Sequence, residues 1–534
     1  TSSPDQANAD FLGVAVHCAK GNALCAAAHG GVADKLPNEP GAYSGFNALY
    51  GNKTVAPQIS PGGPVKDLNG QVITDGSGHI GFPAITFDPL AAQSLAYVAD
   101  MQEHGIPVTY AYIADAHDLH TAAGGTYGPG QAAYVAQLKS YDKAFGTFFA
   151  NLAAHGINRS NTLFMFTADE GDHFVGGPPS PAGCDGITTA CTYKQIGEID
   201  GNLTGLLKTE AGVTTPFKVH ADSAPVFYVN GNPSPDSETV TRPLERAVGA
   251  LTASNPITGG TDRLTNFLAD PVEMKILHMI TADPARTPTF TMFANPNYYL
   301  DTGAPACSST SPCTSLEGPS GSSWNHGDVG PDIDRLWMGV VGPGVANIGQ
   351  DARVWTDETD NRPTMMALVG LKDDYVPDGR VITEILARGV LSPAERLRLG
   401  LLERLGRIYK QIEAPVGRLG LETLVISTRS LESGNAANDS AFARTEKQLQ
   451  ALGSERDTLG AEIRSILNGA EFGGQSLQIS KANLALHRGL ALGARADRLA
   501  VTGRPRTRYS GRCPIRPRSR SARADWASIQ TVRS

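Results

Sequence analysis

The sequence has no long hydrophobic run. No apolar stretch approaches the roughly 18 residues that mark a membrane-crossing helix, so we expect no transmembrane segment. An excess of positive charge is also missing: the formal net charge is -8, which argues against nucleic-acid binding by the folded part. The chain begins TSSPDQANAD, without Met and without a charged segment followed by an apolar one. We therefore expect a processed protein or a fragment.

Cysteine is scarce, but its spacing is informative. Six of the seven cysteines form close pairs in polar, loop-like sequence, and Cys513 is left over. The pairs are Cys18/Cys25, Cys184/Cys191 and Cys307/Cys313. Such short-range pairs predict disulfides and hence an oxidising compartment, so we expect a secreted, periplasmic or cell-surface protein. A zinc clip is the alternative, although none of the pairs has the two-residue gap that is typical of clips.

Regular elements begin near residue 90. DPLAAQSLAYVADMQEHG and GQAAYVAQLKSYDKAFGTFFANLAAHG have the apolar spacing of helices, and each is followed by a strand-like run, VTYAYIAD or TLFMFTAD. The second run is continuously apolar, as strands buried in parallel sheets are. Further strands are expected at 224–231, 289–295 and 335–344. The alternation predicts an α/β fold with a three-layer α/β/α sheet.

The C-terminal part has a different character. Ser392-Pro393-Ala394-Glu395 is a capping box with Pro at the first helical position. Two amphipathic helices follow, and we expect them to form an antiparallel hairpin over residues 391–472. From Gln475 the chain has about 13 basic against 2 acidic residues, a charge of roughly +11. We predict that the basic tail, 473–534, is largely disordered. Two interpretations of this tail remain: an arm that binds nucleic acid, or an extension without function.

Histidines and carboxylates gather at three places. The first strand-like run ends in Asp115, with His117 and His120 close behind. The second ends in Asp169, Glu170, Asp172 and His173. The third place is His326, in a Gly/Ser/Asn loop before the run RLWMGVVGPG. Ligands bind at the carboxyl ends of strands in open α/β sheets, so these groups are candidates for a common site.

Two adjacent acids at the end of an apolar strand repel each other, and a divalent metal is the usual compensation. His173 would add a nitrogen donor, and Asp172 is either a ligand or a supporting acid. A solvated acidic loop is the simpler reading. Of the first group, Asp115 and His120 are preferred as ligands, with His117 as second choice. His326 completes a His/His/Asp set, which suits zinc or a similar metal.

These pieces resemble the alkaline phosphatase superfamily, in its phosphodiesterase and phospholipase C-like branches. The resemblance covers roughly residues 90–390. It rests on Asp115 and His120 before Tyr127-Gly128-Pro129, on the DEGDH stretch, on His326-Gly327 before GVVGPG, and on the closing segment TDETDNRPTMMALVGLKDDYVPDGRVITEIL. It implies two divalent metal ions, zinc or manganese. Asp115, His120 and His326 would hold one ion, and Asp169, Glu170 and His173 the other.

The sequence departs from that family at its beginning. The family starts with a strand ending in an Asp ligand, followed by a Ser or Thr nucleophile on a helix, and neither is found before residue 90. We therefore expect residues 1–390 to be an N-terminally incomplete phosphoesterase domain without its nucleophile. The implied function is hydrolysis of phosphate mono- or diesters, with a phosphate ester as the partner molecule. A non-catalytic metal- or ligand-binding surface protein is the alternative. A homodimer through the helical hairpin is a further expectation.

Overall fold

The computed structural model describes residues 64–73, 89–120, 124–318, 321–372, 375–433, 439–472 and 475–502. The chain divides into two compact units. The first unit comprises Thr1–Thr162 and Pro178–Lys194, and the second comprises Leu163–Gly177 and Gln195–Ser534. Cys18, Cys25 and Cys513 lie outside the described residues.

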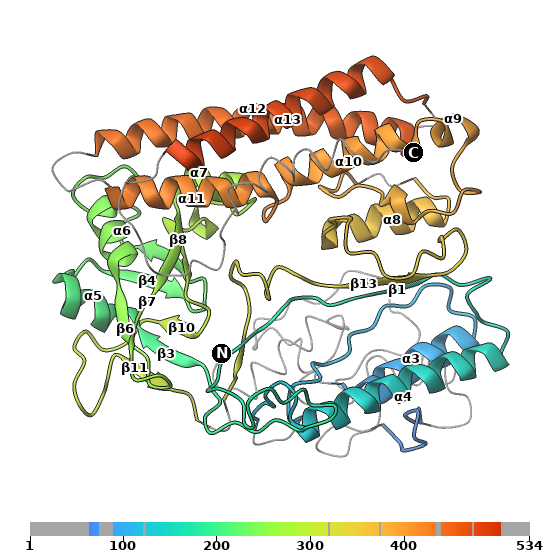
Figure 1. Cartoon of the computed structure of the whole chain (residues 1–534), viewed down its shortest axis with the longest axis horizontal. Helices are drawn as coiled ribbons and strands as arrows, with labels where there is room; N and C mark the ends of the chain where they lie inside the picture. Colours follow the sequence, from blue (N-terminus) through green and yellow to red (C-terminus); the bar gives the residue numbers. More distant parts are fainter. Residues whose placement is uncertain are drawn as a thin grey trace, which may run out of the picture. The chain divides into compact units, whose positions relative to one another are not determined.

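Two helices build the first unit, α3 (Ala91–Glu103) and α4 (Ala132–Ala154), as predicted (Figure 1). Both stop at glycines with positive φ, Gly105 and Gly156. The predicted strand VTYAYIAD does not form: the structure has no strand over residues 107–115, and Val108 and Tyr110 are exposed. A β-branched and aromatic composition favours a strand only where a partner strand completes its hydrogen bonds.

The loop of residues 178–194 is tied to the first unit. The Cys191 amide donates to the carbonyl of Gly130 over 2.9 Å, and the Tyr193 hydroxyl donates to that of Pro129 over 2.7 Å. The predicted disulfide Cys184–Cys191 closes this loop, and Cys307–Cys313 closes another in the second unit. Both predictions are therefore confirmed.

The second unit combines short strands with helices, which confirms the mixed α/β class. Its strands are β1 (Phe164–Thr167), β2 (His173–Phe174), β3 (Ile199–Asn202), β4 (Phe217–His220), β5 (Val226–Val229), β6 (Thr252–Ser254), β7 (Thr261–Arg263), β8 (Thr265–Ala269), β9 (Phe290–Ala294), β10 (Tyr298–Asp301), β11 (Thr314–Leu316), β12 (Trp324–Asn325) and β13 (Met338–Val341). Its helices are α5 (Leu203–Ala211), α6 (Thr241–Ala250), α7 (Pro271–Ile276), α8 (Asn361–Leu368), α9 (Pro393–Arg396), α10 (Leu399–Glu413), α11 (Arg418–Ser433), α12 (Ser440–Glu471) and α13 (Ile479–Thr502).

The described strands form several small sheets. The largest has the order β4-β5-β9-β8 and is antiparallel throughout. Strands β5, β9 and β13 fall within runs predicted to be strands. Strand β1 is also confirmed, but it pairs antiparallel with β13 and is only partly buried. Its assignment to a buried parallel sheet is therefore wrong, because β1 and β13 form a separate two-stranded antiparallel sheet.

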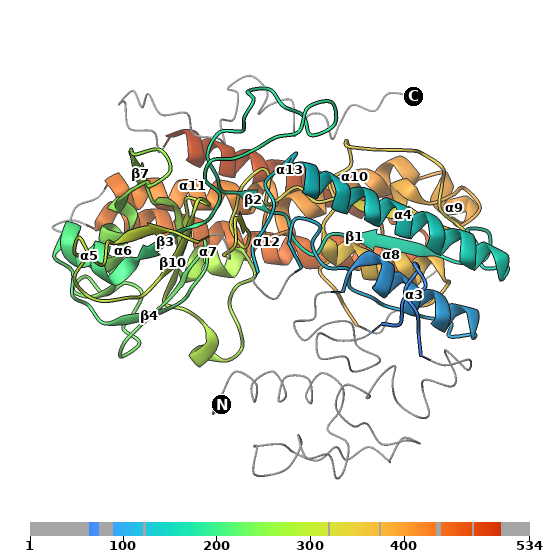
Figure 2. The same ribbon diagram turned by 90° about the horizontal axis from the view of Figure 1, so that it is seen from below.

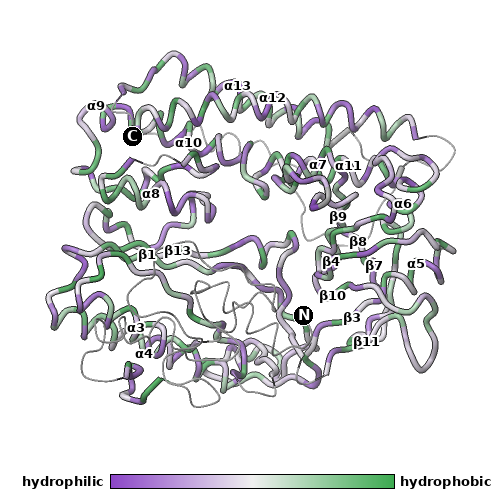
Figure 3. The backbone as a smooth tube through the Cα atoms, turned by 180° about the vertical axis from the view of Figure 1, so that it is seen from behind, coloured by the Kyte–Doolittle hydropathy of each residue, from purple (hydrophilic) through white to green (hydrophobic). Residues whose placement is uncertain are grey.

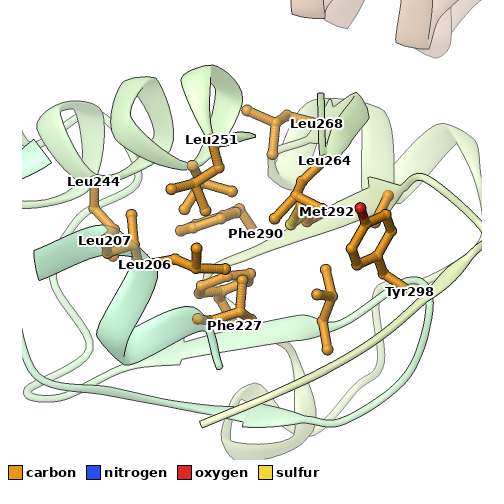
Figure 4. Packing of buried hydrophobic residues seen from close by; sticks show 14 of the residues in the cluster. Leu206, Leu207, Phe227, Leu244, Leu251, Leu264, Leu268, Phe290, Met292 and Tyr298 are labelled. Carbon is orange, nitrogen blue, oxygen red and sulfur yellow. The ribbon is translucent and has the colours of Figure 1, made fainter. Parts of the chain in front are cut away.

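A hydrophobic core lies between helices and strands of the second unit. Figure 4 shows leucines of α5 and α6 beside aromatic side chains of β5 and β9. The rings of Phe227 and Phe290 stack at a centroid distance of 4.5 Å, and neither residue is exposed to solvent. This core fixes the frame from which the loops of the second unit extend.

Helices α10 to α13 pack side by side, as Figure 1 and Figure 2 show. The Ser392 capping box and the helix over 440–471 agree with prediction.

The prediction of disorder is wrong for residues 479–502, which form α13, and residues 503–534 lie outside the described part. Hydrophobic and hydrophilic positions alternate along α12 and α13 (Figure 3). The apolar stripe of α13 is partly alanine, with Ala482 and Ala485 fully buried. Small side chains contribute little to an apolar pattern but allow close helix packing.

The described helices include none that is long and apolar enough to cross a membrane. The four long helices share a core that includes Leu405, Ile408, Leu459 and Ile463. Their apolar stripes are thus buried within this chain. The homodimer expected through a helical hairpin stays a prediction.

Candidate metal centre

A short β-ribbon brings two of the predicted groups together. Strands β2 and β12 pair antiparallel, with Asn325 opposite His173 and Trp324 opposite Phe174. Continuing that register by one step places Asp172 opposite His326 at the end of the ribbon. The rings of Phe174 and Trp324 lie 5.1 Å apart, which adds packing to the two-residue strands. The meeting of Asp172 and His326 is therefore a consequence of strand register.

The imidazole of His326 lies between two carboxylates. Its Nδ1 is 3.2 Å from Oε1 of Glu170 and 3.2 Å from Oδ1 of Asp172. The three side chains offer ligand atoms that all lie within 4.8 Å of one another. Glu170 and His326 are exposed, while the Asp172 side chain is 17% exposed. We refer to Glu170, Asp172 and His326 as the exposed triad.

The backbone around the exposed triad is closely held. A Cβ on Gly171 would lie 2.3 Å from the carbonyl oxygen of Ile333, so only glycine lets the loop approach residue 333. The buried hydroxyl of Ser223 donates to the carbonyl of His326 over 2.6 Å. The buried amide of Asn325 donates to the carbonyls of Pro296 and Tyr298. Both loops of the triad are thus anchored to neighbouring segments.

The carboxylates hold His326 in its charged form. Its hydrogen bond to Asp172, together with the charges of Glu170 and Asp222, raises the pKa of His326 to about 9, although burial works against this. At neutral pH the metal-free side chain is therefore an imidazolium. A metal would have to replace its proton, because only the neutral ring nitrogen can bind a cation.

Sequence reasoning missed two acids beside His326. Asp222 lies close to the turn at Gly327, where a Cβ would sit 2.9 Å from one carboxylate oxygen of Asp222. Glu198 is buried, and this burial raises its pKa to about 7. Asp222 precedes the strand-like run APVFYVNG, so its position before a strand was an available signal. Glu198 stands in a polar loop and had no such signal.

Asp328 is a third acid of this region that sequence reasoning missed. It is 5% exposed, and burial raises its pKa well above the usual range. Its Oδ1 accepts a hydrogen bond from the Val329 amide, whereas its Oδ2 is buried and has no hydrogen-bond partner among the described residues. The loop after His326 thus carries a buried acid close to the exposed triad.

Two predicted ligands lie apart from the exposed triad. His173 has its Nδ1 2.6 Å from Oδ2 of Asp332 and its Nε2 3.0 Å from Oδ1 of Asn297. Both ring nitrogens are therefore already engaged. Asp169 is exposed and is not among the triad's ligand atoms. Among the described residues, neither Asp169 nor His173 forms a group of ligand spacing with Glu170, and the second predicted metal set stays a prediction.

The remaining predicted ligands belong to the first unit. His117 has its Nδ1 3.0 Å from Oδ1 of the neighbouring Asp118, and its carbonyl accepts from the Tyr127 amide. His120 has a positive φ of 51°. Asp115 precedes this turn. A shared site of Asp115, His120 and His326 would join the two units, and it stays a prediction.

The donor set of the exposed triad fits a divalent metal. Ligand atoms at about 2.1 Å from a tetrahedral or octahedral ion lie about 3.0–3.4 Å from one another. The two distances of 3.2 Å from Nδ1 to the carboxylate oxygens fall in that range. One imidazole and two carboxylates suit zinc or manganese. The half-exposed position leaves room for further ligands from solvent or substrate.

No protein-family model matches the chain, and no curated protein matches it.

Proposed function

We propose that this chain is a metal-dependent phosphoric ester hydrolase whose exposed triad binds a catalytic divalent ion. The observation that carries the proposal is the position of the His326 Nδ1, 3.2 Å from each of two carboxylates on a loop more than 150 residues away in sequence. Two carboxylates and an imidazole at the edge of the protein are the donor set of a hydrolytic metal.

The chemistry follows from charge. A divalent ion at the triad would polarise the phosphoryl oxygens of a bound ester and lower the pKa of a water molecule, which would be the attacking group because no Ser or Thr nucleophile is identified. Asp172, which is less exposed than Glu170 and His326, would bind the ion from the protein side. Glu170 would bind it from the solvent side. Asp222 would orient His326 through its charge, in the way that acids beside metal-binding histidines do. The substrate class is a phosphate mono- or diester.

The finer expectations belong to the same proposal. They are membership of the alkaline phosphatase superfamily with its three-layer α/β/α fold, a second metal ion held by the predicted ligands outside the exposed triad (Asp115, His120, Asp169 and His173), and a location outside the cytoplasm. Two disulfides support the location. The order of the sequence motifs supports the family.

The test is hydrolysis of two chromogenic substrates, a phosphate monoester and a phosphate diester, with zinc or manganese added. We expect metal-dependent turnover by the parent chain. Loss of a supporting residue at metal sites costs about 10–100-fold, so His326→Ala should lower the rate by about 100-fold or more. His155→Ala is the matched control, because His155 is exposed and lies on the first unit. Equal rates for parent and His326→Ala would refute the proposal.

The burial and hydrogen bonding of the Ser223 hydroxyl favour a second candidate function. Its hydroxyl is fully buried and committed to the His326 carbonyl, so it is not available as a nucleophile. A metal-binding protein without turnover is the corresponding alternative. Zinc binding measured by equilibrium dialysis distinguishes the two: binding that His326→Ala removes, without hydrolysis by the parent, supports the alternative.

A further inference from the structure

A second group of carboxylates lies inside the second unit. Asp270 precedes α7, Glu273 lies in its first turn, and Glu446 comes from the N-terminal part of α12. Their exposures are 5%, 0% and 8%. Each offers an oxygen, and these oxygens all lie within 4.8 Å of one another. We refer to Asp270, Glu273 and Glu446 as the buried triad.

The positive charge near the buried triad is too small to balance it. Nη1 of Arg242 donates to Oδ2 of Asp270 over 3.0 Å, but it also donates to Oε2 of Glu245 over 2.7 Å. Nε of Arg242 also lies 3.5 Å from Oδ2 of Asp439, so one guanidinium is shared by three carboxylates. Within the described part of the chain, Glu273 and Glu446 form no ion pair with Lys, Arg or His. Glu273 and Glu446 thus lack an ion-pair partner of their own, and Glu446 feels the charge of Arg242 only at longer range.

One oxygen of the buried triad receives no hydrogen bond from a backbone or side-chain donor of the described residues outside the triad. The Asp270 amide donates to Oε2 of Glu273 over 3.2 Å, which completes the capping box of α7. Oε1 of Glu273 is buried and has no hydrogen-bond partner among the described residues. An unsatisfied carboxylate oxygen in a fully buried side chain costs free energy, so its presence indicates a missing partner.

We propose that the buried triad binds a hard divalent cation of the size of Ca²⁺, which braces α7 against α12. Oxygen-only ligands select such ions over zinc or copper. Ca²⁺ binds oxygen at 2.3–2.6 Å, so ligands on opposite sides of it lie about 4.8 Å apart. The three oxygens lie within 4.8 Å of one another, so one such ion can reach all of them. Mg²⁺ fits less well, because it keeps several waters and this site is buried.

Without the cation, protons would have to neutralise the triad. Burial raises the pKa of Glu446 to about 9 and that of Glu273 well above its usual range. A cation would displace these protons and provide the partner that Oε1 of Glu273 lacks. The site is structural, because it joins the end of the sheet strand β8 to the helical layer through α7 and α12.

The test uses the full chain with the exposed triad disabled by Asp172→Asn and His326→Ala, so that only the buried triad can respond. We expect one Ca²⁺ per chain to survive gel filtration. A ligand at 100 times its dissociation constant should raise Tm by about 2–3 °C relative to EDTA, given the size of the chain. No retained Ca²⁺ together with equal Tm values in Ca²⁺ and EDTA would refute the site. Neither measurement depends on hydrolytic activity, so the proposed function can fail independently.

Variants locate the ion. In the same background, Glu446→Gln keeps the shape of the side chain and removes one ligand charge, and we expect it to abolish the Tm response to Ca²⁺. Glu455→Gln is the matched control, because Glu455 lies on the same helix and pairs with Arg495 at the surface. It should keep the full response. A Ca²⁺ response that persists in Glu446→Gln would place the ion elsewhere and overturn the assignment.

Discussion

The second unit holds two acidic triads that differ in their surroundings. In the exposed triad, an imidazolium and solvent balance the carboxylates. In the buried triad, solvent is absent, and a single arginine is shared with Glu245. Groups of three possible ligands thus have different consequences in the two surroundings. At the surface the cost of like charges is small and a metal can exchange, whereas in the interior each uncompensated charge affects the stability of the fold.

The largest expected effect concerns the cation beside the buried triad. Arg242→Met leaves Glu245 and Asp270 buried without their guanidinium, which should lower the free energy of unfolding by about 3–5 kcal/mol. Arg353→Met is the control, because the Arg353 side chain is 87% exposed beside Asp351. It should cause no measurable loss. Urea denaturation checks both variants. Equal losses of unfolding free energy in the two variants would mean that burial does not increase the contribution of an ion pair to stability.

A smaller effect is expected at the loop of the exposed triad. Gly171→Ala places a Cβ 2.3 Å from the Ile333 carbonyl oxygen, so the loop must shift. Such overpacking costs about 1–3 kcal/mol, and the shift should weaken zinc binding about tenfold. Gly146→Ala is the control, because a Cβ there meets nothing within 4 Å in helix α4. Zinc titration and urea denaturation together distinguish displacement of the ligands from general destabilisation.

The smallest effect is the response of the exposed triad to pH. The pKa of His326 is raised to about 9 in the metal-free protein, so zinc must displace a proton below that pH. Zinc affinity should rise about tenfold, or 1.4 kcal/mol, per pH unit up to pH 9 and then level off. The ion pair of His326 stabilises the metal-free fold fully below pH 6.5 and loses that effect as pH rises through about 9. Competition with a chromogenic chelator measures the affinity, and a constant affinity from pH 7 to 9 would contradict the assigned proton.

Elements with strong local signals were predictable. Helices α3 and α4 end at Gly105 and Gly156 as expected, because glycine adopts the positive φ of a helix end without strain. The capping box at Ser392 begins α9 for an equally local reason. The segment VTYAYIAD was predicted to be a strand but does not form one. A strand needs a partner strand, whose presence cannot be inferred from local composition. Helix α13 was missed because its buried face is rich in alanine.

The sequence by itself determined which residues can do chemistry here. Glu170, Asp172 and His326 were all identified by their positions next to strand-like runs. Only the tertiary structure decided which of them meet: the register of β2 against β12 sets Asp172 opposite His326, and Asp332 and Asn297 engage His173. The buried triad was invisible to motif reasoning, because Asp270 and Glu273 look like an ordinary helix cap. Its third member, Glu446, joins them only when α12 packs on α7. Side-chain type is a local property, whereas the distance between charges depends on how remote segments pack.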